Sequence, residues 1–402
     1  MFASRTDWLL TPNRLAKAME ARRKAGLTVL DLTESNPTRC GFSFEAEKVL
    51  KSLADARALA YEPDPRGLLP ARQAVVAYYA ERDIAISPEQ IFLTTSTSEA
   101  YSFLFRLLAN PGEAVLAPRP SYPLFDFLAR LNDLELVPYP LAYHDGWQLD
   151  LQAIQETLER ARPKVRALVV VHPNNPTGSF VSGDELRALV SLCREHDIAL
   201  VADEVFADYA LEADARRVVS HASVRDALTF TLSGLSKISA LPQMKLAWIV
   251  ASGPPELLQP ALARLEIVAD TYLSVSTPLA HALPEMLETR RRVQPQVLAR
   301  VRANLRWLDE QLSPETPLTR LKVEGGWYAV LRLPAVRSDD DWAVELLAED
   351  GVLVHPWHFY DFGAEGHLVI SLLPPPEVFQ EGIRRLLARI ARRALEKRRS
   401  SS

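Results

Sequence analysis

The sequence predicts an α/β protein whose large domain holds a mainly parallel sheet with helices on both faces. Residues 165–171 form a continuous β-branched and apolar run, and residues 198–202 form a second one. Such runs are typical of strands that are buried on both faces. The segment between them, residues 182–196, has the apolar spacing of a helix. A strand, a helix and a strand of these lengths make a βαβ unit, so the two strands are expected to be parallel.

A smaller α+β domain is predicted near the end of the chain, with strands at 329–333, 352–355 and 368–373 and a helix at 341–349. Elsewhere, apolar spacing, capping residues and glycine or proline stops locate the elements. In chain order we expect a helix near 15–22, a strand at 28–33, a helix at 70–81, strands at 91–95 and 114–117 around a helix at 100–109, strands at 229–232 and 246–250, helices at 257–268 and 278–287, a linking helix at 294–312 and a basic terminal helix from about residue 383.

Length and composition narrow the class of protein. A chain of 402 residues is too long for one compact core, which favours two domains. The net charge of −5 provides no basic field, so neither a nucleic acid nor a membrane surface is an expected partner. Cys40 and Cys193 are far apart and belong to no CxxC motif. With no apolar span or signal peptide in view, they predict reduced thiols and a cytoplasmic location.

Polar residues follow several of the predicted strands. Asn175 lies in a cluster of turn residues after one strand, Asp203 ends the next, and residues 96–98 and Lys237 follow two others. In parallel sheets, ligands bind beyond the carboxyl ends of the strands. This convergence is the main argument from the residues themselves for a functional site.

Each of these residues also has a structural interpretation. Ser96 and Glu99 have the spacing of a capping box, although the same exposed backbone donors can seat a phosphate. Lys237, expected in a small-residue loop, is either a surface charge or an amine with a lowered pKa that forms a Schiff base with an aldehyde cofactor. Tyr122, held between prolines, either packs in a core or stacks on a flat ring.

These residues belong to a longer ordered set. The set consists of Tyr61 with Gly67, residues 96–99, Tyr122, Asn175-Pro176-Thr177-Gly178, Asp203-Glu204, and Ser236-Lys237 with Lys245. In this set, and over nearly its whole length, the chain resembles the class I/II aminotransferases, pyridoxal-phosphate enzymes of fold type I. The resemblance implies an enzyme that moves an amino group between an amino acid and a 2-oxo acid by a ping-pong mechanism. It also implies a small domain built from both chain ends, with an arm and part of the small domain in 1–42, the large cofactor-binding domain in 43–290, and the linking helix and C-terminal small domain in 291–402.

The resemblance implies a role for each residue of the set. Lys237 would hold pyridoxal 5′-phosphate as a Schiff base and move the substrate proton. Asp203 would pair with the pyridinium nitrogen, Asn175 would bond the phenolic oxygen and face the substrate, and Tyr122 would stack on the ring. The phosphate would be held by Ser96, Thr97, Ser98, Ser236 and Lys245, and by Tyr61 of a neighbouring subunit, which implies a homodimer with shared active sites.

Three positions depart from the family pattern. Lys245 stands where an arginine is usual, and Phe206 stands where a tyrosine hydroxyl is usual. Val369 occupies the position of the arginine that grips the substrate carboxylate. Candidate replacements for that arginine are Arg39, His355 and His358, and Trp327 is an expected part of the substrate pocket. A metal site at the two histidines is less favoured than a pocket wall, so no metal is expected.

Two other function classes are open at this stage. A lyase or decarboxylase would keep the cofactor and act on an amino-acid-like substrate that is bound without the arginine grip. A cofactor-binding regulator of this fold would carry a DNA-binding extension, for which the short N-terminal arm leaves little room. The leading hypothesis remains transamination between a small-molecule amino donor and an oxo-acid acceptor.

Overall fold

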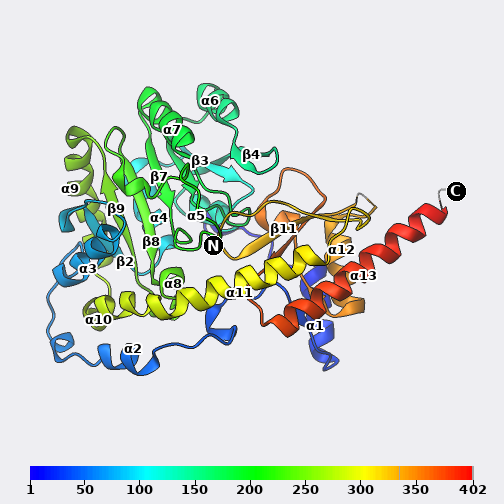
Figure 1. The fold of residues 1–402 in the computed structure, drawn as a ribbon. Coiled ribbons are helices and arrows are strands. Elements are labelled where there is room, and N and C mark those ends of the chain that lie inside the picture. Colours follow the sequence, from blue (N-terminus) through cyan, green and yellow to red (C-terminus); the bar gives the residue numbers. More distant parts are fainter. Residues whose placement is uncertain (335, 401–402) are drawn as a thin grey trace.

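The computed structural model describes residues 1–334 and 336–400, with side chains as far as Glu396. Its large domain is built on an eight-stranded sheet of order β2-β9-β8-β7-β6-β3-β4-β5 (Figure 1). The strands are β2 (Ile91–Thr94), β3 (Ala114–Arg119), β4 (Glu135–Tyr143), β5 (Trp147–Leu149), β6 (Val165–Val171), β7 (Ala199–Asp203), β8 (Thr229–Gly234) and β9 (Ala247–Ser252).

The directions of the strands bring several of their carboxyl ends to the same edge of this sheet. Neighbouring strands from β4 through β3, β6 and β7 to β8 are parallel. Because β9 is antiparallel to both β8 and β2, strand β2 points the same way as β8. The carboxyl ends of β2, β6, β7 and β8 therefore share an edge, and β9 begins there. The predicted mainly parallel sheet and its βαβ unit, with α7 (Gly183–His196) between β6 and β7, are confirmed.

Helices cover both faces of the sheet, as the unbroken apolar runs predict. Along β6, Val169 packs into one buried cluster with α4 and α9, while Leu168 and Val170 pack into another with α6 and α7. A third cluster joins α3 and α10 to β2 and β9. The large-domain helices besides α7 are α3 (Leu69–Ala80), α4 (Thr97–Leu108), α5 (Phe125–Leu131), α6 (Leu151–Arg160), α8 (Leu235–Ile238), α9 (Pro255–Tyr272) and α10 (Thr277–Glu288), and α2 (Ala46–Ser52) packs against α10.

The small domain combines both ends of the chain. Strand β1 (Leu30–Asp31) pairs in parallel with β12 (Val352–Leu353). A second sheet has the order β10 (Thr319–Arg320), β11 (Tyr328–Arg332), β14 (His367–Ser371), β13 (His355–Pro356). Around them lie α1 (Arg14–Lys24), α12 (Asp339–Glu345) and α13 (Pro376–Ser400). Contributions from both ends are confirmed, whereas the boundaries at residues 42 and 290 remain a prediction.

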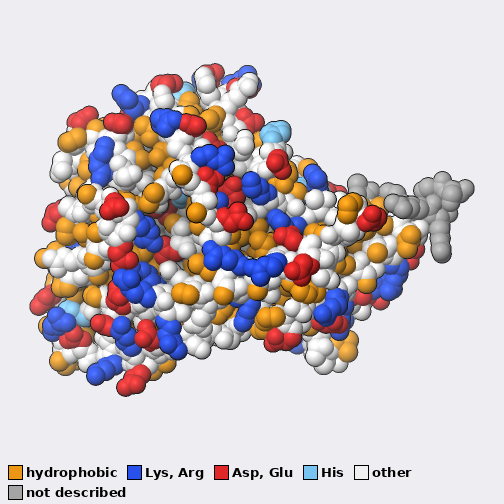
Figure 2. All heavy atoms as spheres, in the orientation of Figure 1, with side chains coloured by type: hydrophobic (Ala, Val, Ile, Leu, Met, Phe, Trp, Pro, Cys, Tyr) orange, Lys and Arg blue, Asp and Glu red, His pale blue; other side chains and the backbone are white. Residues whose placement is uncertain are grey.

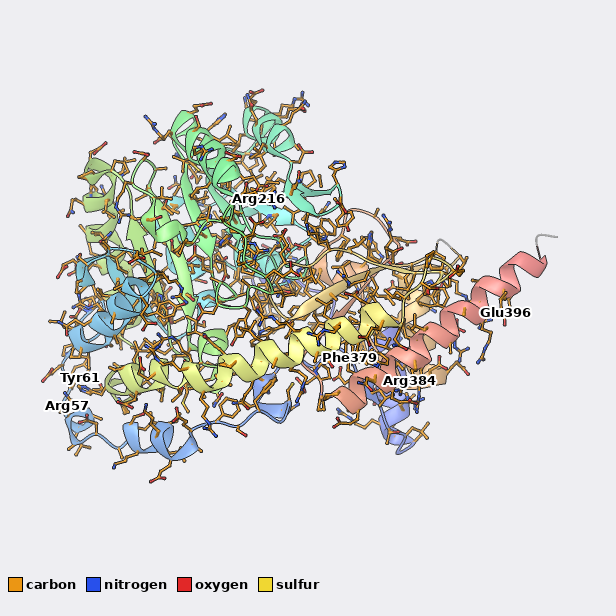
Figure 3. The ribbon with its side chains drawn as sticks, viewed as in Figure 1. Arg57, Tyr61, Arg216, Phe379, Arg384 and Glu396 are labelled. Carbon is orange, nitrogen blue, oxygen red and sulfur yellow. The ribbon has the colours of Figure 1, made fainter. Side chains whose placement is uncertain are left out.

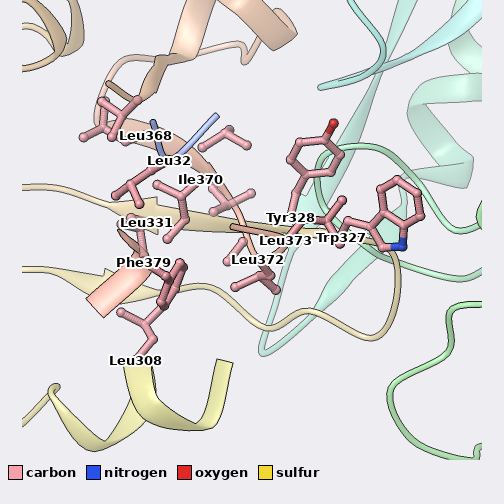
Figure 4. Close-up of a cluster of buried hydrophobic side chains, with 14 of the residues drawn as sticks. Leu32, Leu308, Trp327, Tyr328, Leu331, Leu368, Ile370, Leu372, Leu373 and Phe379 are labelled. Carbon is pink, nitrogen blue, oxygen red and sulfur yellow. The ribbon is translucent and has the colours of Figure 1, made fainter. Parts of the chain in front are cut away.

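Helix α11 (Arg290–Glu310) runs from α10 toward the small sheet, where the linking helix was expected (Figure 1). It contributes Leu308 to the small-domain core. There Leu308 packs with Phe379 of α13 and with Leu32, Leu331 and Leu368 (Figure 4). This core supports β11, which carries residues toward the large domain.

Two local predictions were wrong. The single strand expected at 352–355 is two short strands, because Leu353 pairs with β1 while His355 pairs with β14. Lys237 does not lie in a loop but in the one-turn helix α8, which directly continues β8. The turn is closed by the Ser239 N–H, which donates to the Leu235 carbonyl oxygen.

The molecular surface agrees with the mildly negative charge. On the face shown in Figure 2, Lys and Arg side chains are interspersed with Asp and Glu, so no continuous basic surface forms there. Among the described residues, no helix combines the length and apolar character needed to cross a membrane.

Candidate active site

A cavity of about 330 Å³ lies where the shared strand edge meets the small domain. Of the described residues that line it, only Asp203, Lys237 and Lys245 are charged. The rest of the lining comprises Ser35, Thr95, Ser96, Thr97, Ser98, Tyr122, Val171, Asn175, Val205, Phe206, Ser236, Pro242, Leu246, Ala247 and Tyr328. Except for Tyr61, every residue predicted to bind the cofactor is brought together here.

Lys237 projects into this cavity from α8. The turn is held from outside by Tyr209, whose hydroxyl donates to the Lys237 carbonyl oxygen at 2.7 Å. The Nζ atom lies 4.9 Å from the ring centre of Trp327 and 5.3 Å from that of Phe206. Burial lowers the pKa of Lys237 to about 8, although nearby Asp203 opposes this shift. Lys237 can therefore act as a base or nucleophile near neutral pH.

Asp203 ends β7 and is 6% exposed. One carboxylate oxygen accepts a hydrogen bond from the Tyr101 hydroxyl at 3.2 Å, and the other accepts one from the Val205 N–H at 3.1 Å. Burial raises the pKa of Asp203 to about 6, while these two hydrogen bonds lower it. A positively charged N–H placed against this carboxylate would offset the cost of its burial.

Two adjacent asparagines serve different purposes in the loop after β6. Asn174 holds the loop together: its carbonyl oxygen accepts from the Thr177 hydroxyl at 2.9 Å, and its amide donates to the Pro120 carbonyl oxygen at 3.2 Å. Asn175 lines the cavity, and its buried Oδ1 has no hydrogen-bond partner among the described residues. A buried amide without a partner is costly, so this atom marks a place for a ligand.

The loop ends at Gly178, which has a φ of +73°. A Cβ atom there would lie 2.4 Å from the Gly325 carbonyl oxygen. Only glycine therefore permits the close approach between this loop and the small-domain segment that leads into β11.

The cavity lining is rich in hydrogen-bond donors around the start of α4. Ser96 caps α4, and its hydroxyl accepts from the Glu99 N–H at 3.1 Å, as the capping interpretation predicted. Glu99 instead accepts from the Thr95 N–H at 2.6 Å, so the box is not reciprocal. The first turn of α4 still presents Thr97 and Ser98 to the cavity, and Ser236 and Lys245 line the same cavity. Helix start, hydroxyls and ammonium together suit an anion.

The walls of the cavity also include Tyr122 and Val205. Tyr122 is fixed by an edge-on contact with Phe125, at 6.0 Å between ring centres. Burial raises the pKa of Tyr122 to about 12, so its hydroxyl stays protonated at neutral pH. An aromatic wall of this kind is suited to stacking on a planar ligand.

Some of the predicted site residues lie elsewhere. Tyr61 is 76% exposed and lies near Arg57 at the margin of the molecule (Figure 3). Arg39 is also exposed, and its guanidinium lies 3.9 Å from the Glu34 carboxylate. The structure therefore does not bring these two residues into the cavity of this single chain.

The aromatic side chains expected at the substrate pocket, those of Trp327, His355 and His358, also lie outside the cavity lining. Trp327 is fully buried and contacts Lys237 from behind. His355 stacks on Phe359 at 4.0 Å between ring centres, and burial lowers its pKa to about 4. His358 points to the Asp340 carboxylate at 2.9 Å. Within the described part of the chain, no cluster of three or more His, Cys, Asp or Glu side chains could hold a metal ion.

Sequence reasoning missed three supporting residues. Tyr101 and Tyr209 bond Asp203 and the Lys237 backbone, and Ser35 enters the cavity lining from the loop after β1. Tyr101 could have been anticipated, because it lies on the first turns of the helix whose start faces the site. Ser35 lies in the turn-rich loop 34–39, a kind of segment that often carries ligand contacts but can equally be a plain connection, whereas nothing in the local sequence distinguishes Tyr209.

The cavity fits pyridoxal 5′-phosphate, the cofactor that the sequence resemblance implies. It presents a donor-rich end for the phosphate, a buried carboxylate for a protonated ring nitrogen and an unpartnered amide for a ring oxygen. It also presents a lysine with a lowered pKa for the aldehyde.

Known proteins agree with this architecture. A solved structure of alanine aminotransferase from Pyrococcus furiosus superposes with a TM-score of 0.86 over 98% of this chain and 100% of that one, at 21% identity. Glutamate-pyruvate aminotransferase AlaA of Haemophilus influenzae is 25% identical over 90% of each chain. S-alkyl-thiohydroximate lyase SUR1 of Arabidopsis thaliana is 28% identical over 82% of this chain and 74% of its own.

The family model for aminotransferase class I and II matches residues 28–389, which include every described strand of the three sheets. All the residues that line the cavity and the sheets of the small domain fall within this match. The chain therefore belongs to the class I and II aminotransferases, pyridoxal-phosphate-dependent enzymes of fold type I.

Proposed function

We propose that this enzyme transfers the amino group of an α-amino acid to a 2-oxo acid in two half-reactions at the same cavity, with Lys237 as the catalytic residue. The observation that carries the proposal is the pairing of a lysine of lowered pKa with a buried carboxylate in one cavity. A base and a counter-ion for a positively charged ring are the two groups that such a transfer requires.

Bound pyridoxal 5′-phosphate withdraws electrons from the substrate carbon that bears the amino group and thereby makes its hydrogen acidic. Lys237 would accept that proton at Nζ and donate it to the cofactor carbon that carried the aldehyde, so that the amino group stays with the cofactor. Nζ is buried beside the rings of Trp327 and Phe206, and this burial favours the neutral amine. Tyr209 fixes the backbone of the same turn, so Nζ stays at one position.

The remaining residues hold and orient the ring. Asp203, fixed by Tyr101 and the Val205 N–H, would keep the ring nitrogen protonated. Asn175 would bond the ring oxygen and face the substrate, and Tyr122 would stack on the ring. The phosphate would lie against Ser96, Thr97, Ser98, Ser236 and Lys245.

The names of relatives suggest which substrates to try first. A glutamate-pyruvate aminotransferase and an alanine aminotransferase are among the similar proteins, so we propose alanine and glutamate as donors. The test is to mix the purified yellow protein with single amino acids and follow the absorbance of the cofactor as it takes up the amino group. An enzyme that takes the amino group from no amino acid would contradict the proposal.

A pH titration of the cofactor-free protein tests the state of Lys237 directly. A protonated amine does not acylate, so labelling by acetic anhydride should increase as pH rises through the pKa. We expect a midpoint near pH 8 for Lys237, measured by peptide mass spectrometry. A short lysine peptide added to the same sample serves as the internal control and should follow the ordinary lysine value, about 10.4. Equal midpoints for the two lysines would show that the cavity does not perturb Lys237.

Lys245 should contribute to cofactor affinity rather than to the chemistry. Lys245→Ala removes a charged partner of the phosphate, and a hydrogen bond to a charged group contributes about 1.5–3 kcal/mol. We therefore expect cofactor binding to weaken about 10- to 100-fold, as measured by fluorescence titration, while Lys245→Arg keeps the affinity. If Lys245→Ala binds the cofactor as tightly as the parent, the phosphate lies elsewhere.

We further propose a homodimer, with Tyr61 completing the phosphate site of the second subunit. The exposed apolar side chains Leu59, Tyr61, Tyr272 and Leu273 support it, because such groups favour burial against another surface. Sedimentation equilibrium that gave the mass of one chain at micromolar concentration would overturn the dimer. A cytoplasmic location is proposed from the two free, buried cysteines.

The second candidate is a carbon–sulfur lyase reaction on the same cofactor, favoured by the similarity to SUR1. Unlike transamination, a lyase reaction needs no oxo acid as a second substrate, because the amino group leaves as ammonia. Ammonia release from a sulfur-containing amino acid without any oxo acid would support this candidate over transamination.

A further inference from the structure

One wall of the cavity comes from the small domain and carries two hydroxyl groups. Ser35 follows β1 near the start of the chain, and Tyr328 opens β11 near its end. Figure 4 shows the Tyr328 hydroxyl pointing away from the aliphatic side chains of the small-domain core. The hydroxyl lies beside the side chains of Ser35 and Tyr360, and burial raises the pKa of Tyr328, so it remains a donor.

The part of the sheet nearest Tyr328 brings no charge to this wall. Arg332, four residues along β11, shares the face of Tyr328 but is exposed and does not line the cavity. In antiparallel pairs, directly opposed residues share a face. Tyr328 opposes Ser371, two residues along the strand Val330 opposes Val369, and Val369 also opposes His355. All five therefore lie on the same face. His355, with a pKa of about 4, is neutral at physiological pH.

Nearby cations outside the sheet are paired or point elsewhere. Arg119 bonds the Asp361 carboxylate at 2.7 Å, and Arg39 is exposed beside Glu34. Among the described lining residues there is no arginine, and the two lysines are the ones that we assign to the aldehyde and to the phosphate of the cofactor. The small-domain residues that line the cavity, Ser35 and Tyr328, are therefore neutral and carry hydroxyl groups. The carboxylate of Glu34 lies close enough to raise the pKa of Tyr328 further, but Glu34 does not line the cavity, and its carboxylate lies 3.9 Å from the Arg39 guanidinium.

The substrate must reach this wall. Lys237 moves a proton at the carbon that bears the amino group, so that carbon lies close to Nζ. The Phe206 ring lies 5.3 Å from Nζ and 6.3 Å from the Tyr328 ring. A carboxylate on the same carbon would extend beyond the apolar Phe206 ring and come within reach of the hydroxyl groups of Tyr328 and Ser35. A carboxylate enclosed without hydrogen bonds is strongly disfavoured, so these donors decide whether it is accepted.

We propose that Tyr328, assisted by Ser35, is the specificity-determining residue that holds the α-carboxylate of the substrate through hydrogen bonds from neutral hydroxyl groups. The inference rests on the proposed transamination and assigns the group that recognises its substrate class.

The test compares Tyr328→Phe with the parent holoenzyme. With the amino acid that reacts fastest with the parent, we expect KM to rise about 10- to 100-fold, because a hydrogen bond to a charged group is lost, while kcat changes less than about threefold. The Kd of propanoate, a carboxylate without an amino group, should rise by the same factor in calorimetry. Cofactor affinity should stay unchanged.

Tyr139→Phe is the matched control. Its buried hydroxyl donates to the Val169 carbonyl oxygen at 2.8 Å, away from the cavity lining, so its loss should leave KM and propanoate binding unchanged. Ser35→Ala provides a second variant if Tyr328→Phe folds poorly, and it should raise both constants in the same direction by a smaller factor.

Several results would overturn the inference. They are unchanged propanoate binding in both variants, no propanoate binding by the parent, or a joint fall of kcat and cofactor affinity, which would mark a purely structural role for Tyr328. Failure of the parent enzyme to take an amino group from any amino acid is a different result and would contradict the proposed function itself.

Discussion

Replacing Lys237 by alanine is expected to lower kcat for amino transfer on the order of 10⁴-fold. The loss reflects the removal of the acid–base group, a contribution of about 10²–10⁴ in enzymes generally. No other amine lines the reacting part of the cavity among the described residues, since Lys245 lies with the phosphate donors. Single-turnover absorbance of the cofactor measures the effect.

The Lys237→Ala variant has a positive control of its own. Added ethylamine, a small amine that fits the space left by the side chain, should restore part of the rate in proportion to its unprotonated fraction. Lys164→Ala, at an exposed site, should retain full activity. A Lys237→Ala enzyme within tenfold of the parent would mean that another group moves the proton.

Asp203→Asn is expected to reduce kcat by about 10²- to 10³-fold, the range seen when one preorganised electrostatic partner is removed. The amide preserves the shape and the bond from Tyr101 but loses the negative charge that keeps the ring nitrogen protonated. Steady-state kinetics and the absorbance spectrum of the bound cofactor both report the change.

Asp145→Asn is a suitable control for this charge-to-amide replacement. Asp145 is exposed and has a φ of +56°, a conformation that asparagine also tolerates. Its kinetics should match those of the parent. If Asp203→Asn did the same, a protonated ring nitrogen would not be required for the reaction.

Sequence patterns predicted the structure best at positions where burial requires an apolar side chain. Strand β6 lies at the predicted residues 165–171, because a central parallel strand needs apolar side chains on both faces. The same logic brought Asp203, Asn175 and Lys237 together, since they follow strands that end at one edge. The capping role of Ser96 was likewise readable, because it depends on a residue only three positions away.

Other features depend on partners distant in sequence. No element was predicted over residues 125–160, where β4 carries Pro138 and Pro140 and is partly exposed, so it lacks the pattern of a buried strand. The division between β12 and β13 is set by two different partner strands. Tyr61 cannot be placed from one chain, because its expected ligand belongs to another subunit.

The pairing of β1 with β12 has a consequence for the order in which the protein is made. Residues that line the cavity from the large domain lie between Thr95 and Ala247, and their sheet can assemble on the ribosome before the C-terminal segment is translated. Leu30 of β1 can form its strand pairing only after Val352 of β12 has been synthesised. We therefore expect the hydroxyl wall to be the last part of the cavity to form, after the residues that we assign to the cofactor.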